Sequence, residues 1–114
     1  MSAPERDADR VRMRISTKGP RHDAKRVHVF YTGRVQGVGF RITVEEIAQT
    51  LEVVGWVRNL RDGRVELVAE APQERLERFL EAVRTGPMKN FIGQIDATWS
   101  AATGTFNDFS IRYY

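Results

Sequence analysis

The chain has 114 residues, of which 41% are hydrophobic and 29% charged, a composition typical of one folded domain. It contains no cysteine, which excludes disulfides, zinc thiolates and thiol nucleophiles. No stretch approaches the roughly 18 uninterrupted apolar residues of a membrane-spanning helix, so no membrane association is expected.

The formal net charge of +3 is concentrated near the N-terminus. Residues 1–26 hold eight basic and four acidic side chains, whereas residues 27–114 hold ten basic and eleven acidic ones. We therefore predict a flexible basic tail over residues 1–26 and a nearly neutral domain over residues 27–114. The tail lacks the apolar core of about seven residues that a secretory signal needs, and it is too acidic for a transit peptide. The expected location is the cytoplasm.

The first half of the domain predicts a strand, a helix and a hairpin. Residues 27–32 are rich in β-branched and aromatic side chains, which favours a strand. Apolar residues then recur at helical spacing between Phe40 and Leu51. A second strand is expected over residues 53–60, and Asp62-Gly63 predicts a tight turn into a third, alternating strand from Val65.

The second half predicts another helix and two more strands. Pro72 suits a first helical turn, the stripe from Leu76 to Val83 has helical spacing, and Gly86-Pro87 ends the helix. Alternation predicts a fourth strand around residues 95–99 and a fifth over 109–113. The order is that of a ferredoxin-like α/β sandwich with a fifth strand, in which one mostly antiparallel sheet carries two helices on one face.

The segment most informative about chemistry is residues 33–41 (GRVQGVGFR), between the first strand and the first helix. Glycines allow successive backbone N–H groups to point at one anion, and the helix adds its positive N-terminal end. Arg41, in the first turn, adds a guanidinium that matches a phosphate. The loop has neither the Gly-Lys-Ser/Thr ending of a Walker loop nor the third glycine of a dinucleotide fingerprint. Composition alone leaves open whether it binds an anion or is simply a turn.

Residues 33–41 resemble the first signature of the acylphosphatase family. Residues 55–59 (GWVRN) with 62–66 (DGRVE) resemble its second signature, and the likeness extends through the ending 109–113 (FSIRY). It covers about residues 27 to 114. The resemblance implies a ferredoxin-like sandwich and an enzyme that hydrolyses small-molecule acyl phosphates to a carboxylate and inorganic phosphate.

The resemblance also implies roles for individual residues. Arg41 would bind the substrate phosphate and Asn59 would position the attacking water. The phosphoryl oxygens would be held by the loop amides of Gln36, Gly37, Val38, Gly39 and Phe40. No metal, cofactor or covalent intermediate is implied, and a monomer is expected. The residues agree with this easy chemistry, because a carboxylate leaving group has a pKa near ~4 and needs no general acid.

Other residues are interpreted as structural. Gln36 is expected to support its loop, Trp56 to pack, and His28 to be a satisfied core or sheet-face histidine. Two positions depart from the family pattern: Glu52 stands where a glycine commonly ends the first helix, and Ala71 replaces a glycine after the third strand. We expect strain or an altered shape at the Glu52 turn, because a left-handed helix cap is costlier without glycine. Residues 88–93 suggest no role.

Two alternative functions are considered. Ferredoxin-like sheets also serve as RNA platforms, with Phe30, Tyr31 and Trp56 as candidate stacking residues. The domain's net charge of −1 and its lack of an RNA-recognition motif argue against nucleic acid as a partner. The second alternative is a stand-alone relative of the acylphosphatase-like domains found in larger carbamoyl-transfer proteins. Because the chain ends at Tyr114, a free enzyme is the favoured expectation.

Overall fold

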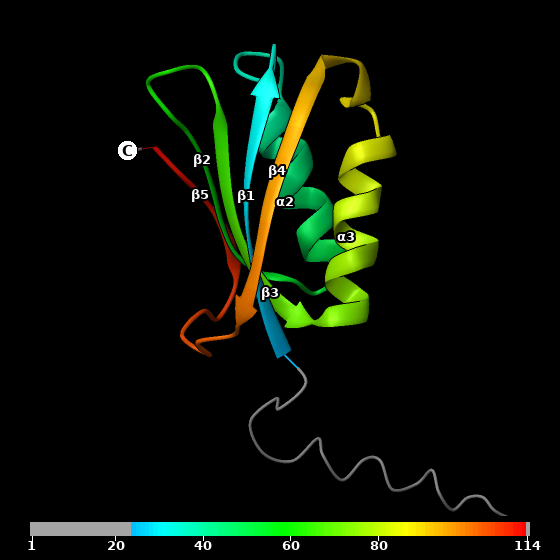
Figure 1. Ribbon diagram of the computed structural model, residues 1–114, viewed down its shortest axis with the longest axis vertical. Coiled ribbons are helices and arrows are strands. Elements are labelled where there is room, and N and C mark those ends of the chain that lie inside the picture. The colour runs from blue at the N-terminus through cyan, green and yellow to red at the C-terminus, as the bar shows by residue number, and fades with distance from the viewer. Residues whose placement is uncertain (1–23, 114) are drawn as a thin grey trace, which may run out of the picture.

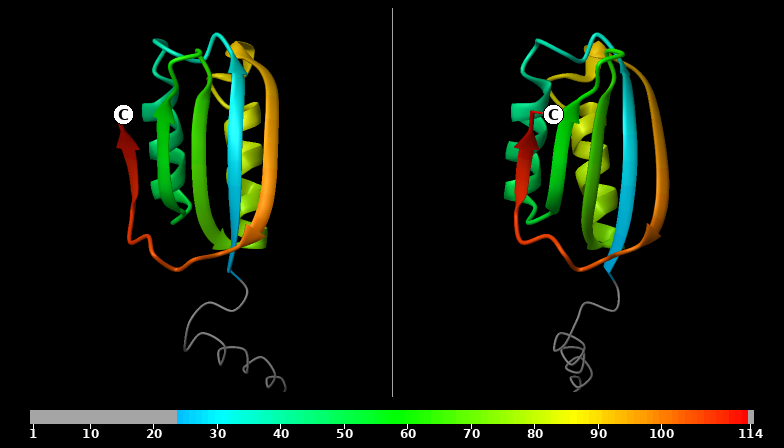
Figure 2. Two further views of the ribbon diagram at one scale, coloured as in Figure 1. Left: turned by 60° about the vertical axis from the view of Figure 1, so that its left-hand side comes forward. Right: turned by 90° about the vertical axis from the view of Figure 1, so that its left-hand side faces the viewer.

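The computed structural model describes residues 24–113, which form a five-stranded sheet covered on one face by two helices (Figures 1 and 2). The predicted sandwich is thus confirmed. The strands are β1 (Ala24–Gly33), β2 (Val54–Asn59), β3 (Val65–Pro72), β4 (Ile92–Ala101) and β5 (Phe109–Arg112). The helices are α2 (Phe40–Thr50) and α3 (Gln73–Thr85), with a short 3-10 helix, η2 (Lys89–Phe91), before β4.

The sheet has the strand order β4-β1-β3-β2-β5, and only the β2–β5 pair is parallel. Because β1 and β2 are both antiparallel to β3, they run in the same direction, and β5 runs with them. The carboxyl ends of these three strands therefore meet at one edge of the sheet. The loop that leads from β1 into α2 lies at this edge (Figure 1).

The core lies between the sheet and the two helices. Alternate residues of β1 and β3 face the helices and are buried, and the helices contribute the stripes predicted from their spacing. The main contributors are Val29, Tyr31 and Leu67 from the strands and Phe40 and Phe79 from the helices. Burial of such apolar side chains is the main stabilising contribution to a domain of this size.

Strand β3 differs from the expected alternation, because all its residues from Val65 to Ala71 are buried. The helices cover one face of β3, and side chains of β1 and β2 together with the β4–β5 connection cover the other. The carboxylates of Glu66 and Glu70 are consequently buried on the open face and need partners. Glu70 accepts hydrogen bonds from the Thr103 hydroxyl at 2.8 Å and from the amides of Thr103 and Gly104, and it pairs with Arg26 at 3.4 Å. Glu70 therefore holds the β4–β5 connection against the sheet.

Some element boundaries differ from the sequence expectations. Strand β1 begins at Ala24 rather than Val27, because residues 24–26 pair with β3 and residues 25 and 26 also pair with β4. The rest of the predicted basic tail lies outside the described residues. Pro72 does not lie in the first helical turn: it is the residue before α3, in an extended conformation at φ −56° and ψ 145°. Strand β5 ends at Arg112, so Tyr113 projects beyond it.

The expected strain at the end of α2 is present. Glu52 has a φ of 58°, and it is the only non-glycine residue with positive φ in the described part of the chain. Its carbonyl accepts a hydrogen bond from Arg75 at 3.0 Å, which helps to hold the turn.

We expect Glu52→Gly to stabilise the protein by about 1 kcal/mol, because glycine adopts a left-handed conformation without the Cβ conflict. The measurement is the urea midpoint of unfolding. Activity should not change, since the residue lies at the opposite end of an 11-residue helix from the β1–α2 loop. As a matched control, Glu46→Gly in the helical middle should destabilise by about 1 kcal/mol. A loss of stability in Glu52→Gly would contradict the prediction.

Candidate active site

The β1–α2 loop curls because glycines occupy backbone conformations that other residues disfavour. Gly39, the N-cap of α2, has a left-handed φ of 86°, and no side chain caps the helix. Gly33, where the loop leaves β1, packs so tightly that an added Cβ would lie 2.3 Å from the Phe91 carbonyl oxygen. The shape of the loop therefore depends on glycine at positions 33 and 39.

The loop contains a run of backbone amides that have no backbone acceptor among the described residues. The Arg34 amide donates to the Phe91 carbonyl at 2.9 Å, and the next amide to donate to a backbone group in the described chain is that of Thr43. The amides between them donate to no backbone carbonyl of the described residues. They lie at the N-terminus of α2, where the helix dipole favours negative charge. A helix start that follows a glycine loop is an arrangement that commonly binds anions.

Two contacts hold the loop in place. The Gln36 amide nitrogen donates to the carbonyls of Leu60 and Arg64 at 2.7 and 2.9 Å, which ties the loop to the β2–β3 turn. On the other side, Phe91 of η2 accepts the hydrogen bond from Arg34. The supporting role expected for Gln36 is confirmed. The sequence suggested no role for residues 88–93, because their contribution is made by a backbone carbonyl that carries no residue-specific signal.

A cavity of about 160 Å³ brings the predicted site residues together. The lining residues come from the loop, the first turn of α2 and the end of β2: Val35, Gly37, Gly39, Phe40, Arg41, Ile42 and Asn59. Arg41 and Asn59 are 18 positions apart in sequence and meet here because α2 starts at the edge where β2 ends. Gln36 and Val38 are not among the lining residues.

Arg41 is oriented by the C-terminal end of β5. One guanidinium nitrogen donates to the Arg112 carbonyl at 3.5 Å, and the guanidinium carbon lies 5.0 Å from the centre of the Tyr113 ring. Arg41 has no carboxylate partner among the described residues. Its charge and most of its donors are therefore available to an anion in the cavity.

Asn59 carries the clearest chemical signal in the cavity. Its side-chain oxygen is buried and has no hydrogen-bond partner among the described residues. A buried acceptor left unpaired costs about 1–3 kcal/mol, so such a group is uncommon without a function. The oxygen is able to accept a hydrogen bond from a donor held in the cavity, such as a water molecule.

The open face of the sheet next to Asn59 carries a charged cluster. One carboxylate oxygen of Glu66 accepts a hydrogen bond from the Arg58 guanidinium at 2.8 Å, and the His28 imidazole lies 2.6 Å from the other oxygen. Burial tends to raise the pKa of Glu66, but the hydrogen bonds to His28 and Arg58 together lower it below its usual value. His28 is thus a satisfied sheet-face histidine, as predicted.

The aromatic residues considered for RNA stacking are mostly inaccessible. Tyr31 is fully buried in the core, where burial raises the pKa of its hydroxyl. Trp56 is 8% exposed and packs between the guanidinium groups of Arg58 and Arg112 at 5.2 and 4.6 Å. The packing role expected for Trp56 is confirmed. Phe30 is half-buried, and the Arg64 guanidinium lies 4.5 Å from the centre of its ring.

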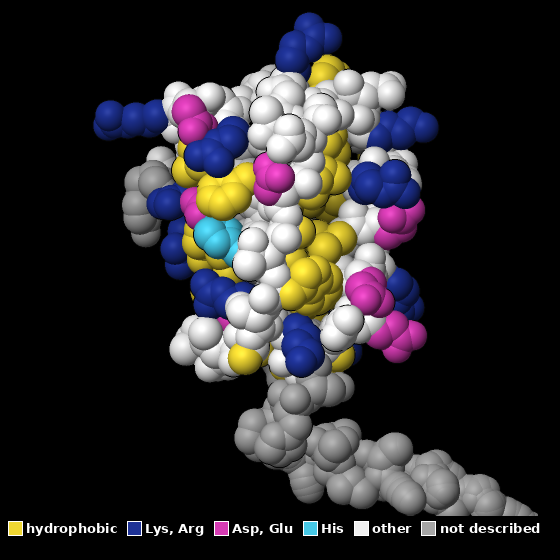
Figure 3. Space-filling model, in the orientation of Figure 1, with side chains coloured by type: hydrophobic (Ala, Val, Ile, Leu, Met, Phe, Trp, Pro, Cys, Tyr) yellow, Lys and Arg dark blue, Asp and Glu magenta, His cyan; other side chains and the backbone are white. Residues whose placement is uncertain are grey.

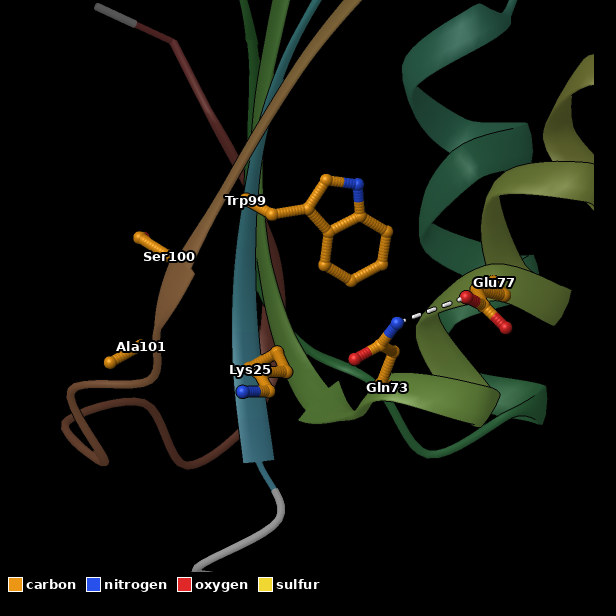
Figure 4. Close-up of a pocket in the computed structure, with 6 residues that line it drawn as sticks. All are labelled: Lys25, Gln73, Glu77, Trp99, Ser100 and Ala101. Atoms are coloured by element: carbon orange, nitrogen blue, oxygen red, sulfur yellow. Dashed lines mark hydrogen bonds between the residues drawn. The ribbon is translucent and has the colours of Figure 1, made fainter.

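A larger cavity of about 440 Å³ lies at the opposite end of the sheet, between β4 and the start of α3 (Figure 4). Trp99 projects into the cavity from β4. On the side formed by α3, the Gln73 amide donates a hydrogen bond to the Glu77 carboxylate at 3.2 Å. Above it, apolar side chains form a band between β4 and α3 that is visible in Figure 3. Neither feature combines free amides with an unpaired cation, so the cavity beside Arg41 is the better candidate for chemistry.

The fold is a small α/β sandwich, with a glycine-rich loop and a cavity at the start of its first helix. Comparison with known proteins gives the family. The sequence profile of the acylphosphatase family matches residues 27–111. The chain belongs to the acylphosphatase family, hydrolases that act on small acyl phosphates.

Individual relatives agree with this assignment. The acylphosphatase of Salinibacter ruber is 48% identical over 88 residues, which is 77% of this chain and 93% of the relative. The acylphosphatase crystal structure from Bacillus subtilis superposes with a TM-score of 0.73 at 40% identity, covering 78% of this chain and 99% of that one. An acylphosphatase structure from Coxiella burnetii superposes with a TM-score of 0.74 at 30% identity, covering 84% and 100%.

Among the described residues, no helix is long and apolar enough to cross a membrane.

Proposed function

We propose that the cavity beside Arg41 is the catalytic site of this acylphosphatase. The phosphoryl group is held by the backbone amides of the loop from Gln36 to Phe40 and by the Arg41 guanidinium. Asn59 orients the attacking water. Three observations carry the proposal: among the described residues, the loop amides have no backbone acceptor, the Arg41 guanidinium has no carboxylate partner, and the Asn59 side-chain oxygen has no hydrogen-bond partner, and all three lie at one small cavity.

The reaction follows from these groups. Water attacks phosphorus, the bond between phosphorus and the carboxyl oxygen breaks, and the carboxylate leaves with the bonding electrons. The water's proton passes to a phosphoryl oxygen of the substrate. Arg41 and the amides stabilise the charge on the equatorial oxygens as the transition state forms. Because the carboxylate is a good leaving group, positioning and charge stabilisation suffice, and we propose that no metal or cofactor takes part.

The test is release of inorganic phosphate from acetyl phosphate by the purified protein, with and without EDTA. We expect metal-independent hydrolysis, and we expect the double variant Arg41→Ala, Asn59→Ala to approach the uncatalysed rate. Wild-type protein no faster than this double variant would refute the proposed site. Loss of activity with EDTA that returns with a divalent cation would refute the metal-independent mechanism alone.

We also propose that the enzyme acts as a monomer in the cytoplasm and takes no nucleic acid as partner. One chain supplies every residue of the proposed site, so no second copy is needed to complete it. Light scattering tests the oligomeric state, cell fractionation tests the location, and a salt-dependent binding assay with single-stranded RNA tests the absence of a nucleic-acid partner.

A further inference from the structure

Two exposed hydrophobic side chains stand beside the proposed phosphate site. The large hydrophobic residues with high exposure in the described chain are Ile42, Trp99 and Tyr113, at 56%, 40% and 77%. Ile42 lines the 160 Å³ cavity, and the ring of Tyr113 lies 5.0 Å from the Arg41 guanidinium. Trp99 lies at the other end of the sheet. Two of the three therefore flank the same arginine.

Core packing does not account for either exposed residue at the site. The buried stripe of α2 consists of Phe40, Val44 and Ala48, and Ile42 lies off this stripe. Tyr113 follows the last residue of β5, so it pairs with no strand. Because Arg41 covers only part of the Tyr113 ring, most of the ring is open to solvent. Exposed apolar groups gathered at a binding cavity commonly contact the ligand.

The groups that line the cavity are already assigned to the phosphoryl group and the attacking water. These are the loop amides, Arg41 and Asn59. The acyl group would then extend past the cavity toward the exposed side chains at its rim. Arg41 is the only charged residue among those that line the cavity, and it is already assigned to the phosphate. A second anionic group on the substrate finds no further cation in this lining.

We propose that Ile42 and Tyr113 form the acyl-binding rim, and that the preferred substrates carry an uncharged, apolar acyl group of aryl or branched-alkyl type. The inference rests on the proposed position of the phosphate. Contact with an acyl group is the same before and during cleavage of the phosphorus–oxygen bond. Such uniform binding lowers KM and leaves kcat nearly unchanged.

The test compares benzoyl phosphate with acetyl phosphate, using the ratio of their kcat/KM values in each variant so that intrinsic reactivity cancels. Losing contact with about 50 Å² of apolar surface corresponds to roughly five- to tenfold in affinity. We therefore expect Ile42→Ala and Tyr113→Ala each to lower the benzoyl-to-acetyl ratio about five- to tenfold, mainly by raising KM for benzoyl phosphate. Tyr113→Phe, which keeps the ring, should retain the wild-type ratio. Trp99→Ala, the matched control for an exposed hydrophobic residue, should retain it as well.

The outcomes separate this inference from the proposed function. If the wild type hydrolyses both substrates and the ratio is unchanged in Ile42→Ala and Tyr113→Ala, the acyl-binding rim is wrong and the catalytic site stands. Equal losses on both substrates would also overturn the rim, because they would show that these side chains act only through Arg41. If the wild type hydrolyses neither substrate, the proposed function itself fails.

Discussion

Replacing Arg41 with alanine is expected to lower kcat/KM for acetyl phosphate by about 10³-fold, equivalent to about 4 kcal/mol of transition-state stabilisation. Arg41 is the only charged side chain in the cavity lining, so no neighbouring group there takes over its role. Phosphate release at several substrate concentrations provides the measurement. Both KM and kcat should change, because the guanidinium binds the phosphate in the ground state and more strongly in the transition state.

Lysine at position 41 is expected to recover only part of the loss. An ammonium group retains the charge but does not offer the planar, two-pronged donor geometry of a guanidinium. Arg78→Ala, on the exposed surface of α3, removes the same side chain far from the cavity and should leave kcat/KM within about twofold of wild type. If Arg41→Ala and Arg78→Ala proved equally active, Arg41 would have no part in the reaction.

Asn59→Ala is expected to lower kcat by about 10²- to 10³-fold while KM changes by about twofold or less. The proposed role concerns the attacking water and not the phosphate, so substrate binding should persist. The same substitution should not reduce the free energy of unfolding, because it removes a buried oxygen that has no partner among the described residues. Steady-state kinetics and urea unfolding of the same preparation test both statements.

The pairing of lost activity with retained stability distinguishes a catalytic asparagine from a structural one. Asn107→Ala, in the exposed β4–β5 connection, serves as the matched control and should change neither quantity. A large drop in stability with proportionate loss of activity would instead assign Asn59 a packing role. Asn59→Asp keeps the side-chain shape but places a carboxylate beside the phosphoryl group, so it should be at least as inactive as Asn59→Ala.

Much of the fold was predictable because its signals are local. Helical spacing identified α2 and α3, and Asp62-Gly63 identified the β2–β3 turn. Strain or an altered shape at Glu52 was expected because the family commonly has a glycine there, and Glu52 does have a left-handed φ of 58°. The extent of β1, in contrast, depends on pairing with β3 and β4, which single-strand patterns do not reveal. The burial of Glu66 and Glu70 likewise follows from the central position of β3, not from their alternation with apolar residues.

The candidate site divides in the same way. The loop glycines and Arg41 suggested a candidate anion site by their order along the chain, and the resemblance to the family signatures pointed to Arg41 and Asn59 as its residues. The support of the loop by Gln36 was expected, but its partners are backbone carbonyls 24 and 28 residues away. The contribution of Phe91 and the positions of Ile42 and Tyr113 beside Arg41 had no sequence signal.

Length, composition and net charge first indicated a basic protein. The distribution of the charges then indicated a nearly neutral domain in which one arginine follows a glycine-rich loop. The sequence by itself determined the elements, the family and the residue types of the site, because backbone preferences and apolar periodicity act over a few neighbouring positions. Only the tertiary structure decided which groups face the cavity and which remain without a partner. Those properties depend on the sheet order, which brings the ends of β1, β2 and β5 to one edge from distant parts of the chain.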